Sequence, residues 1–453
     1  MDKVGLIKKY NVAAPRYTSY PTVPYWSKSP TIDEWKHEVK KAFDETNSKE
    51  GISIYIHLPF CQSLCTYCGC NTRITTNHKV EQPYIKAVLK EWEMYLGVLK
   101  DKPRIKELHL GGGTPTFFNP EHLKELLSGI LLTADVCEGV EFSFEGHPNN
   151  TTHEHLKVLR EFGFTRVSFG IQDLDPKVQE IINRIQPVEN VERATNDARQ
   201  LGYTSINYDL IYGLPLQKKS SIIHTAETVV RLLPDRIALY SYAHVPWIKP
   251  GQRKFTEADL PEDEEKRELY ETARNILEKA GYVEIGMDHF ALKTDSLYKA
   301  MKTKTLHRNF MGYTGNYTRL MIGLGVSAIS DTWSAFAQNI KTVEEYYDAI
   351  NKGVLPIFRG HLLSDEDMVL RKHILNIMCR FETSWFDKNE QTQTVYDAMH
   401  LLKEMEMDGL IERAPFRLTV KEEGRKFIRN ICMAFDAYLL RNASEKQIFS
   451  KVI

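Results

Sequence analysis

The sequence predicts an α/β protein whose central unit is a partial (β/α)6 barrel, preceded by an N-terminal arm and followed by a mostly helical C-terminal domain. Three observations support this prediction. Six short apolar segments alternate with longer helical stretches between residues 52 and 240, which is typical of a parallel sheet covered by helices. Six units are fewer than the eight of a closed barrel. Closely spaced prolines precede this region, and the alternation stops after about residue 255.

The first fifty residues combine an irregular segment with one helix. Pro15 and Pro21 fall within the turn-rich stretch 10–22, and prolines so close together prevent a regular helix. We therefore expect an extended arm there, followed by a helix near residues 32–46.

The predicted barrel consists of strands and helices in strict alternation. The expected strands are 52–56, 105–110, 140–145, 166–170, 205–210 and 236–240. The expected helices are 84–99, 120–132, 153–162, 188–201 and 220–232. Because ligands of parallel α/β sheets bind at the carboxyl ends of the strands, we expect the site at that end.

The remaining chain is less regular. We expect a helix at 262–280, a strand end at 286–291, and a second change of composition near residue 360. The segment 365–440 has the pattern of a small winged-helix-like domain, with two helices, a hairpin around 410–420 and a final helix. The predicted segments are 1–48 (arm and helix), 49–255 (barrel), 256–360 (barrel extension and substrate-site elements) and 361–453 (C-terminal domain).

Composition and charge restrict the partners. The 59 Lys+Arg and 60 Asp+Glu residues leave a formal net charge of -1, so the whole molecule offers no field that would attract nucleic acid or an acidic membrane. Seven cysteines are an odd and modest number, which argues against a secreted disulfide framework. No apolar run is long enough to span a bilayer, and the N-terminus lacks the apolar core of a secretory signal. We expect a monomeric cytoplasmic protein that binds neither nucleic acid nor membranes.

Four of the seven cysteines fall within ten residues, directly after the first predicted strand. Cys61, Cys65 and Cys68 have the spacing C-x3-C-x2-C, which allows three thiolates from one loop to hold three corners of a [4Fe–4S] cluster. The fourth iron then has no protein ligand and can bind a substrate, as an open position does in catalytic metal sites. The sequence therefore predicts a catalytic iron–sulfur centre, with Cys70 beside it in an unassigned role.

The cysteine group is compatible with three alternatives to this centre. A structural zinc site would need two ligand pairs on separate knuckles. A closed four-cysteine cluster would have to use Cys70, and the short step from Cys68 is a strained way to reach a fourth corner. Chance clustering of redox-inert thiols is the third alternative.

Glycines and polar groups follow several later strands. Gly111 to Gly113 precede Thr114 at the end of the second strand; glycines let a backbone approach a ligand closely, although a tight turn would account for them equally well. Arg184 lies on the helix after the fourth strand, and the polar strand ends are Glu145, Gln172 and Asp209. Such side chains suit ribose hydroxyls or an ammonium group, whereas each alone could cap the following helix. Because they recur around one rim, we expect a ligand site there.

The cysteine spacing is shared by the radical S-adenosylmethionine (SAM) enzymes, and the whole chain closely resembles one of their families, the oxygen-independent coproporphyrinogen III oxidases. The cysteine motif alone marks only the superfamily. The family resemblance runs nearly from end to end. The matching stretches are 15–21, 61–70, 111–116, 242–246, 286–291, 306–310, 323–330 and 429–436.

The resemblance implies oxidative decarboxylation of the ring A and ring B propionates of coproporphyrinogen III to vinyl groups, giving protoporphyrinogen IX. It implies a [4Fe–4S] cluster on Cys61, Cys65 and Cys68, two SAM molecules, and a 5′-deoxyadenosyl radical that takes a hydrogen from the propionate β-carbon. A low-potential electron donor and an electron acceptor are implied as well. Our own hypothesis is that the N-terminal arm folds over the barrel mouth and excludes water from the radical.

The resemblance also implies site residues by position. The cluster-bound SAM would be contacted by Tyr55, Tyr67, Gly112, Glu145 and Arg184. The second SAM would be contacted by Gly113, Thr114, Gln172, Asp209, Ala243 and Ile329. Because the substrate carries four carboxylates and the chain is nearly neutral, local cations must bind it, and the candidates near family motifs are Arg16, Arg73 and Arg308.

One stretch departs from the family pattern. After Glu145 we expect an apolar residue and then Asp or Asn, but Gly146 and His147 stand there instead. We expect His147 to be a loop residue rather than a ligand, so the departure bears on the fine contacts around Glu145 and not on the reaction class.

Three further functions are compatible with the sequence. A radical SAM haem chaperone would share the barrel but would generally lack a cysteine matching Cys70 and the proline-rich arm, and both are present. A radical SAM enzyme that opens or methylates a porphyrin ring is the second alternative. A structural or nucleic-acid-binding role for the winged-helix-like end is the third, although the neutral charge favours a substrate-covering lid.

Overall fold

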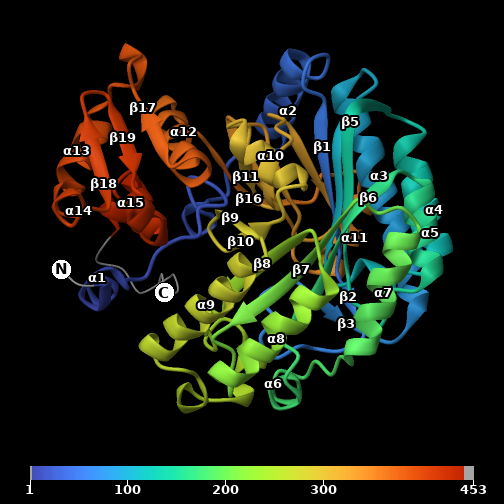
Figure 1. Ribbon diagram of the computed structural model, residues 1–453. Helices are drawn as coiled ribbons and strands as arrows, with labels where there is room; N and C mark the ends of the chain where they lie inside the picture. The colour runs from blue at the N-terminus through green and yellow to red at the C-terminus, as the bar shows by residue number, and fades with distance from the viewer. Residues whose placement is uncertain (1–2, 443–453) are drawn as a thin grey trace.

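A twelve-stranded sheet forms the centre of the molecule. The computed structural model describes residues 3–442 (Figure 1). Six neighbouring parallel strands match the six that the sequence predicts: β1 (Ile52–Leu58), β4 (Arg104–Gly112), β5 (Asp135–Gly146), β6 (Phe164–Gln172), β7 (Ser205–Tyr212) and β8 (Arg236–Ser241). Within residues 3–442, the two outermost strands of the sheet do not pair with each other. The prediction of a partial barrel is therefore confirmed.

The region after β8 extends this sheet at both edges. Beside β1 lie the parallel β13 (Met321–Leu324) and then the antiparallel β14 (Ile329–Asp331), β15 (Ala335–Asn339) and β16 (Ile357–Leu362). Beside β8 lie the antiparallel β10 (His289–Ala291) and β9 (Val283–Gly286). Residues far apart in sequence thus flank the first and the last strand of the barrel.

Helices cover the outer face of the parallel strands (Figure 1). They are α3 (Glu81–Leu99), α4 (Pro120–Leu131), α5 (His153–Glu161), α6 (Pro176–Ile181), α7 (Val188–Gln200) and α8 (Lys219–Leu232). Their starts follow local rules: Thr152 caps α5 by accepting the His155 N–H, and Asp175 caps α6, because oxygen side chains satisfy the free N–H groups of a first turn. The apolar β1 side chains Ile54, Ile56 and Leu58 are fully buried beneath them.

The N-terminal arm packs on the C-terminal domain rather than on the barrel helices. Residues 11–22 form no regular helix or strand, as the prolines predict, but a short helix α1 (Lys3–Tyr10) precedes them. The local sequence does not predict α1, because this helix is stabilised by contacts of its apolar residues Leu6 and Ile7 with a core that is distant in sequence. The predicted helix α2 (Ile32–Thr46) follows, with a capping box at Thr31.

The C-terminal domain has the predicted order of helices, hairpin and final helices. Its elements are α12 (Asp365–Arg380), β17 (Glu382–Ser384), α13 (Gln393–Leu401), α14 (Lys403–Met407), β18 (Ile411–Ala414), β19 (Arg417–Val420), α15 (Ile428–Met433) and α16 (Ala437–Arg441). The hairpin β18–β19 is joined by β17, which pairs with β19 and completes a three-stranded sheet. The division into four segments at residues 48, 255 and 360 stays a proposal.

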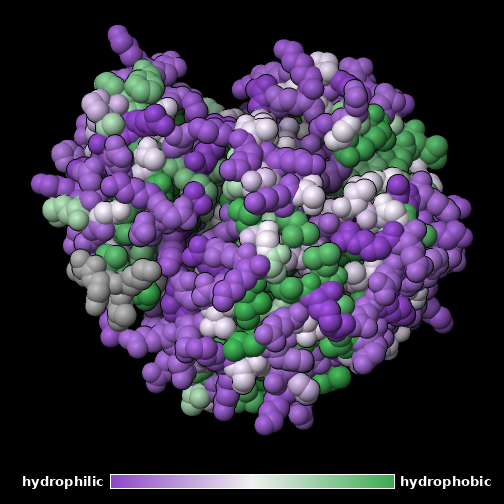
Figure 2. Space-filling view, in the orientation of Figure 1, coloured by the Kyte–Doolittle hydropathy of each residue, from purple (hydrophilic) through white to green (hydrophobic). Residues whose placement is uncertain are grey.

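The other elements are short, apart from α9. They are α9 (Asp263–Lys279), α10 (Ser296–Lys302), α11 (Val343–Asn351), β2 (Phe60–Cys61), β3 (Arg73–Ile74), β11 (His307–Asn309), β12 (Gly312–Thr314), and the 3-10 helices Val23–Tyr25, His78–Val80, Pro115–Phe117, Pro250–Lys254, Glu257–Asp259, Lys388–Glu390 and Glu422–Phe427. The face in Figure 2 is mostly hydrophilic, with an indentation at its upper edge between the C-terminal domain and the barrel. In the described part of the chain, no helix is both long and apolar enough to cross a bilayer.

Candidate active site

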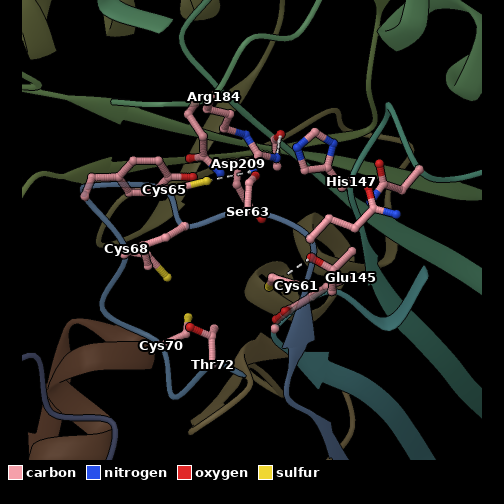
Figure 3. Close-up of a pocket in the computed structure, with 18 of the residues that line it drawn as sticks. Cys61, Ser63, Cys65, Cys68, Cys70, Thr72, Glu145, His147, Arg184 and Asp209 are labelled. Atoms are coloured by element: carbon pink, nitrogen blue, oxygen red, sulfur yellow. Dashed lines mark hydrogen bonds between the residues drawn. The ribbon is translucent and has the colours of Figure 1, made fainter. Parts of the chain in front are cut away.

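The carboxyl ends of the parallel strands open into a cavity of about 440 Å³. The loop after β1 forms one wall, and the ends of β4 to β7 form the other. Figure 3 shows cysteine side chains from this loop facing the same space as Glu145, Arg184 and Asp209. The sequence-predicted residues that line the cavity are Cys61, Cys65, Tyr67, Cys68, Cys70, Gly112, Gly113, Thr114, Glu145, Gln172, Arg184 and Asp209.

The cysteines of the loop are thiols with polar neighbours. All seven cysteines of the chain are free. The sulfur of Cys61 lies 3.3 Å from the Thr114 hydroxyl, and Arg184 Nη1 donates to Cys65 Sγ over 3.6 Å. Burial raises the pKa of the Cys61 thiol to about 11. A hydrogen bond from the Cys70 side chain lowers the pKa of the Cys68 thiol to about 6.

The donor set fits an iron–sulfur cluster better than a zinc ion. Iron–sulfur clusters take thiolate ligands, and here four thiols of one loop line one cavity, the predicted ligands Cys61, Cys65 and Cys68 together with Cys70. Within residues 3–442, no three or more His, Cys, Asp or Glu side chains are gathered so that they could hold a single metal ion, whereas the ligands of a structural zinc converge on one point. The buried Arg184 Nε has no hydrogen-bond partner among the described residues, so it has a donor left for an anionic group beside the thiols.

The glycines at the end of β4 are required by close packing. Gly112 has φ of +115°, and a Cβ there would lie 2.8 Å from the His57 ring. A Cβ on Gly113 would lie 2.5 Å from the Pro59 carbonyl oxygen. Side chains at these positions would push the end of β4 away from the start of the cysteine loop. The glycines therefore hold the two walls of the cavity together.

Glu145 ends β5 with its carboxylate toward the cavity. Its Oε2 accepts the Gly112 N–H over 3.2 Å, and its Oε1 lies 3.5 Å from His109 Nε2. Desolvation alone would raise the pKa of Glu145, but the hydrogen bond and charge of His109 together with the Gly112 N–H lower it overall. The site therefore offers a stable carboxylate, which suits an ammonium group or hydroxyl donors.

Asp209 and Gln172 occupy the ends of two neighbouring strands. Asp209 accepts hydrogen bonds from the Ser168 hydroxyl over 2.8 Å and from Asn207 Nδ2 over 2.9 Å, and burial raises its pKa to about 6. Gln172 adopts a left-handed backbone with φ of +67°, which is uncommon for a residue with a side chain. Both side chains are thus positioned by the strand ends rather than by caps of the following helices.

Arg184 connects the cysteine loop to the strand ends. Its Nη2 donates to the Gly170 carbonyl, and its Nη1 reaches Cys65. A Cβ on Gly170 would lie 2.9 Å from Arg184 Nη2, so this glycine makes room for the guanidinium. The arrangement presents a cation, Arg184, and a carboxylate, Glu145, to one cavity.

The remaining residues carried over from the resemblance lie outside the cavity lining. Tyr55 lies on β1 below it, where its hydroxyl is 3.0 Å from His57 Nδ1 and its ring stacks on His109. Ala243 follows β8 and accepts a hydrogen bond from Gln252. Ile329 begins β14, and its carbonyl oxygen would lie 2.4 Å from a Cβ on Gly323.

The three candidate substrate arginines lie in different places. Arg16, on the arm, donates to the Ser241 carbonyl over 2.8 Å and lies 3.5 Å from Asp288 Oδ2. Arg308 is buried above the Tyr313 ring, and its Nε and Nη1 have no hydrogen-bond partner within the described chain. Arg73 is exposed and pairs with Glu344 over 3.0 Å. The structure thus places two of the three arginines in the space between barrel and C-terminal domain.

The sequence missed two further cations near Arg16, the half-buried Lys266 and the buried Arg429. Lys266 of α9 donates to the Tyr242 carbonyl, and burial followed by the charge of Arg16 lowers its pKa to about 8. Burial and Arg16 also lower the pKa of Arg429 to about 10. Nothing in the charged pattern of α9 distinguishes Lys266 from a surface lysine, so only the packing reveals it. His147 also lines the cavity, from the loop that we expected it to occupy.

The chain matches known proteins along nearly its whole length. The model of the radical SAM superfamily matches residues 55–229. The oxygen-independent coproporphyrinogen III oxidase of Synechocystis is 37% identical over 99% of this chain and 97% of its own length, and that of Escherichia coli is 37% identical over 99% and 98%. The chain belongs to the oxygen-independent coproporphyrinogen III oxidase family. A solved structure described as the Escherichia coli coproporphyrinogen III oxidase, a radical SAM enzyme, superimposes with a TM-score of 0.89 over 96% of this chain and 99% of that one, at 34% identity.

Membership of this family makes the chain a radical SAM oxidoreductase. A [4Fe–4S] cluster and SAM follow from the superfamily, and the cysteine cavity is the site that fits them. The family prediction made from the arm, cysteine and tail motifs is thereby confirmed.

Proposed function

We propose that this chain oxidatively decarboxylates the ring A and ring B propionates of coproporphyrinogen III and releases protoporphyrinogen IX. The observation that carries the proposal is the convergence of three thiols, Glu145, Arg184 and Asp209 on one cavity at the carboxyl end of the barrel, in a chain related to coproporphyrinogen III oxidases over its full length. The same relatedness favours the oxidase over a haem chaperone or a ring-modifying enzyme. We also propose that it acts as a monomer and in the cytoplasm, and its seven free cysteines favour such a reducing compartment.

Cys61, Cys65 and Cys68 would hold the cluster. When bound, the cluster and SAM supply a 5′-deoxyadenosyl radical that removes a hydrogen atom from the propionate side chain. Arg184 and Glu145 face the same cavity with opposite charges, so they suit the carboxylate and the ammonium or hydroxyl groups of SAM. Gly112, Tyr55 and the backbone at Tyr67 complete the proposed contacts of this first SAM.

A second SAM would use the remaining polar wall of the cavity. Gly113, Thr114, Gln172 and Asp209 line it, and the carboxylate of Asp209 suits ribose hydroxyls. Ala243 and Ile329 would contribute from the segments after β8 and at β14. Whether two molecules bind is decided by counting SAM per chain in equilibrium dialysis of the reconstituted enzyme; two per chain are expected.

The substrate carboxylates would be met by the cations between barrel and C-terminal domain. Three cations lie near one another around Asp288: Arg16, Lys266 and Arg429. The charge of Arg16 lowers the pKa of both Lys266 and Arg429. Arg308, whose Nη2 donates to the Arg16 carbonyl over 3.5 Å, adds two guanidinium nitrogens, Nε and Nη1, that have no hydrogen-bond partner within the described chain. Several cations gathered in a partly buried space favour an anionic ligand. Arg73 pairs with Glu344 outside this region and has no part in the proposed contact.

The decisive experiment uses the anaerobically reconstituted enzyme with SAM, dithionite, an electron acceptor and coproporphyrinogen III. Release of two CO2 per substrate with formation of two vinyl groups is expected. Cleavage of SAM with bound porphyrin but no CO2 would contradict the oxidase and favour the chaperone.

Two variants test the roles of Cys70 and Arg308. Cys70→Ser is expected to retain the cluster, read by iron content, and to lose turnover if Cys70 takes part in the chemistry.

Arg308→Leu is expected to raise KM for the porphyrinogen at least tenfold, because a charge-assisted hydrogen bond contributes about 1.5–3 kcal/mol, while SAM binding and iron content stay unchanged. An unchanged KM would remove Arg308 from the substrate site.

A further inference from the structure

A basic and aromatic patch lies on the surface beside the cysteine loop. It is built from the loop after β8, the turn after β15, and β16. Its members are Trp247, Ile248, Lys249, Lys341, Phe358 and Arg359. The apolar members are unusually open to solvent, since Trp247 is 60%, Ile248 57% and Phe358 50% exposed. Exposed apolar side chains that gather with charged neighbours are typical of interaction sites.

The cations of this patch are not neutralised by neighbours. Among residues 3–442, neither Lys249, Lys341 nor Arg359 forms an ion pair. Lys341 and Arg359 approach the Phe358 ring at 5.6 Å and 5.8 Å. Burial lowers the pKa of Lys341, and the charges of Arg359 and Lys249 lower it further. The three cations therefore form one group of positive charges, and none of them has an ion-pair partner among residues 3–442.

The patch is bound directly to the loop that carries the cysteines. Lys249 Nζ donates to the Cys70 carbonyl over 3.2 Å, and Asn71 Nδ2 donates to the Lys341 carbonyl over 2.9 Å. From the same loop as Trp247, Gln252 donates to the Tyr67 carbonyl over 3.2 Å. A protein that covers this patch would thus contact residues that are themselves hydrogen-bonded to the cysteine loop.

We propose that this patch is the docking surface for an acidic protein that delivers single electrons to the cysteine-held cluster. The inference rests on the proposed function, because only a cluster that must be reduced needs a donor. The carrier, a low-potential flavin or iron–sulfur protein, loses one electron and the cluster gains it. Opposite charges speed such encounters, and electron transfer weakens steeply with distance, so the place beside the cysteine loop matters as much as the charge.

The patch fits a protein better than nucleic acid. Binding to nucleic acid rests on many phosphate contacts, whereas this patch has three cations in a chain of net charge -1. The exposed Trp247 and Phe358 instead provide the aromatic centre that protein interfaces favour.

The test measures docking and electron delivery separately. The probe is a bacterial flavodoxin, an acidic FMN protein, mixed with reconstituted holoenzyme. Lys341→Glu, alone and combined with Lys249→Glu, is expected to weaken flavodoxin binding at least tenfold in a titration. The same variants are expected to slow reduction of the cluster by flavodoxin at least tenfold, followed by its absorbance and its electron paramagnetic resonance signal, and to flatten the salt dependence of that rate. Lys403→Glu, an exposed lysine of α14 in the C-terminal domain, is the matched control and is expected to change neither quantity.

Reduction by dithionite separates this proposal from the proposed function. Dithionite is small and needs no docking surface, so it is expected to reduce the cluster equally well in all variants. Equal flavodoxin binding and reduction in wild type and double variant would overturn the docking surface while leaving the oxidase in place. A chain whose thiols hold no reducible cluster under dithionite would overturn both. Variants that lose binding to anionic vesicles or RNA, with flavodoxin reduction unchanged, would also overturn it.

Discussion

The cavity wall and the seam between arm and C-terminal domain are built in different ways. The cavity wall takes side chains from successive β–α units, each close to its strand in sequence, and leaves Arg184 Nε without a hydrogen-bond partner among the described residues. The arm seam, which we define as the contacts of residues 10–20 with residues 408–437, joins groups about 400 residues apart. Arg429 donates to the Ala14 and Pro15 carbonyls, and Tyr17 donates to Asp436 over 3.1 Å. The comparison teaches that the wall presents side chains to a ligand, whereas the seam joins the arm to the C-terminal domain by buried hydrogen bonds and in doing so positions two of the proposed substrate cations, Arg16 and Arg429.

Among variants that distinguish the cavity wall from the arm seam, a substitution in the cysteine loop is expected to have the largest effect on activity. Cys65→Ala removes one of three cluster ligands and is expected to abolish iron binding and turnover while leaving the fold intact. Iron content and far-ultraviolet circular dichroism measure the two properties. Cys137→Ala, a buried cysteine outside the loop, is the control. Full iron content in the Cys65 variant would assign the cluster to other ligands.

A seam variant is expected to show the opposite pattern. Arg429→Leu leaves two buried carbonyls without a donor, and we expect a loss of about 3 kcal/mol of stability, seen as a lower melting temperature and faster proteolysis of residues 1–22. Iron content should stay unchanged, because the cysteine loop does not touch Arg429. Arg417→Ala, an exposed arginine of the same domain, is the control. Equal melting temperatures would show that the seam contributes little.

The seam is also expected to respond to pH. Burial raises the pKa of Asp436 to about 6, above the ordinary value of about 3.9 in an unfolded chain, so the folded state binds a proton more tightly. The stabilisation that Asp436 contributes is fully present below its unfolded pKa of about 3.9 and is lost as the pH rises through its folded pKa of about 6. Between pH 5 and pH 7 the loss is about 1 kcal/mol.

Asp436→Asn cannot ionise, and its single carbonyl oxygen can keep the bond from the Leu439 N–H, whereas its NH2 group replaces the oxygen that accepts from Tyr17. It is expected to remove this part of the pH dependence, which melting curves at pH 5 and pH 7 would measure. An identical pH dependence in the variant would assign the effect to another group.

The smallest effect is expected at Arg73. Its exposed pair with Glu344 is expected to contribute at most about 0.5 kcal/mol, as surface ion pairs do. Arg73→Ala should leave both KM for the porphyrinogen and the melting temperature unchanged. A raised KM would place Arg73 at the substrate after all and weaken the contrast between wall and surface.

Local pattern is the reason that the wall could be predicted from the sequence. The cysteines, glycines and polar strand ends each follow a strand directly, and parallel strands carry their carboxyl ends to one edge. Arg73 shows the limit of this reasoning. Its neighbours Thr72 and Ile74 line the cavity, but Arg73 turns outward, because successive side chains of an extended segment point to opposite sides.

The seam and the sheet edges could not be predicted in this way. Helix α1 forms because Leu6 and Ile7 pack on a core that includes residues 285–313 and 370–437, and β13 pairs with β1 across 268 residues, as in the pair Ile54 and Ile322. Lys266 likewise looks like any charged residue of a surface helix until α9 is packed. Such contacts depend on long-range pairing, which leaves no periodic trace in one segment.

By itself, the sequence determined the β–α alternation, the thiol loop and the family, because each depends on residues that are close together along the chain. The tertiary structure alone decided which cations surround Asp288, how the arm is bound, and which surface lies beside the cysteine loop. The physical reason is that charge and burial act through space. Lys249 and Lys341 are 92 residues apart by number, yet both are hydrogen-bonded to one short loop, Lys249 through its side chain and Lys341 through its carbonyl.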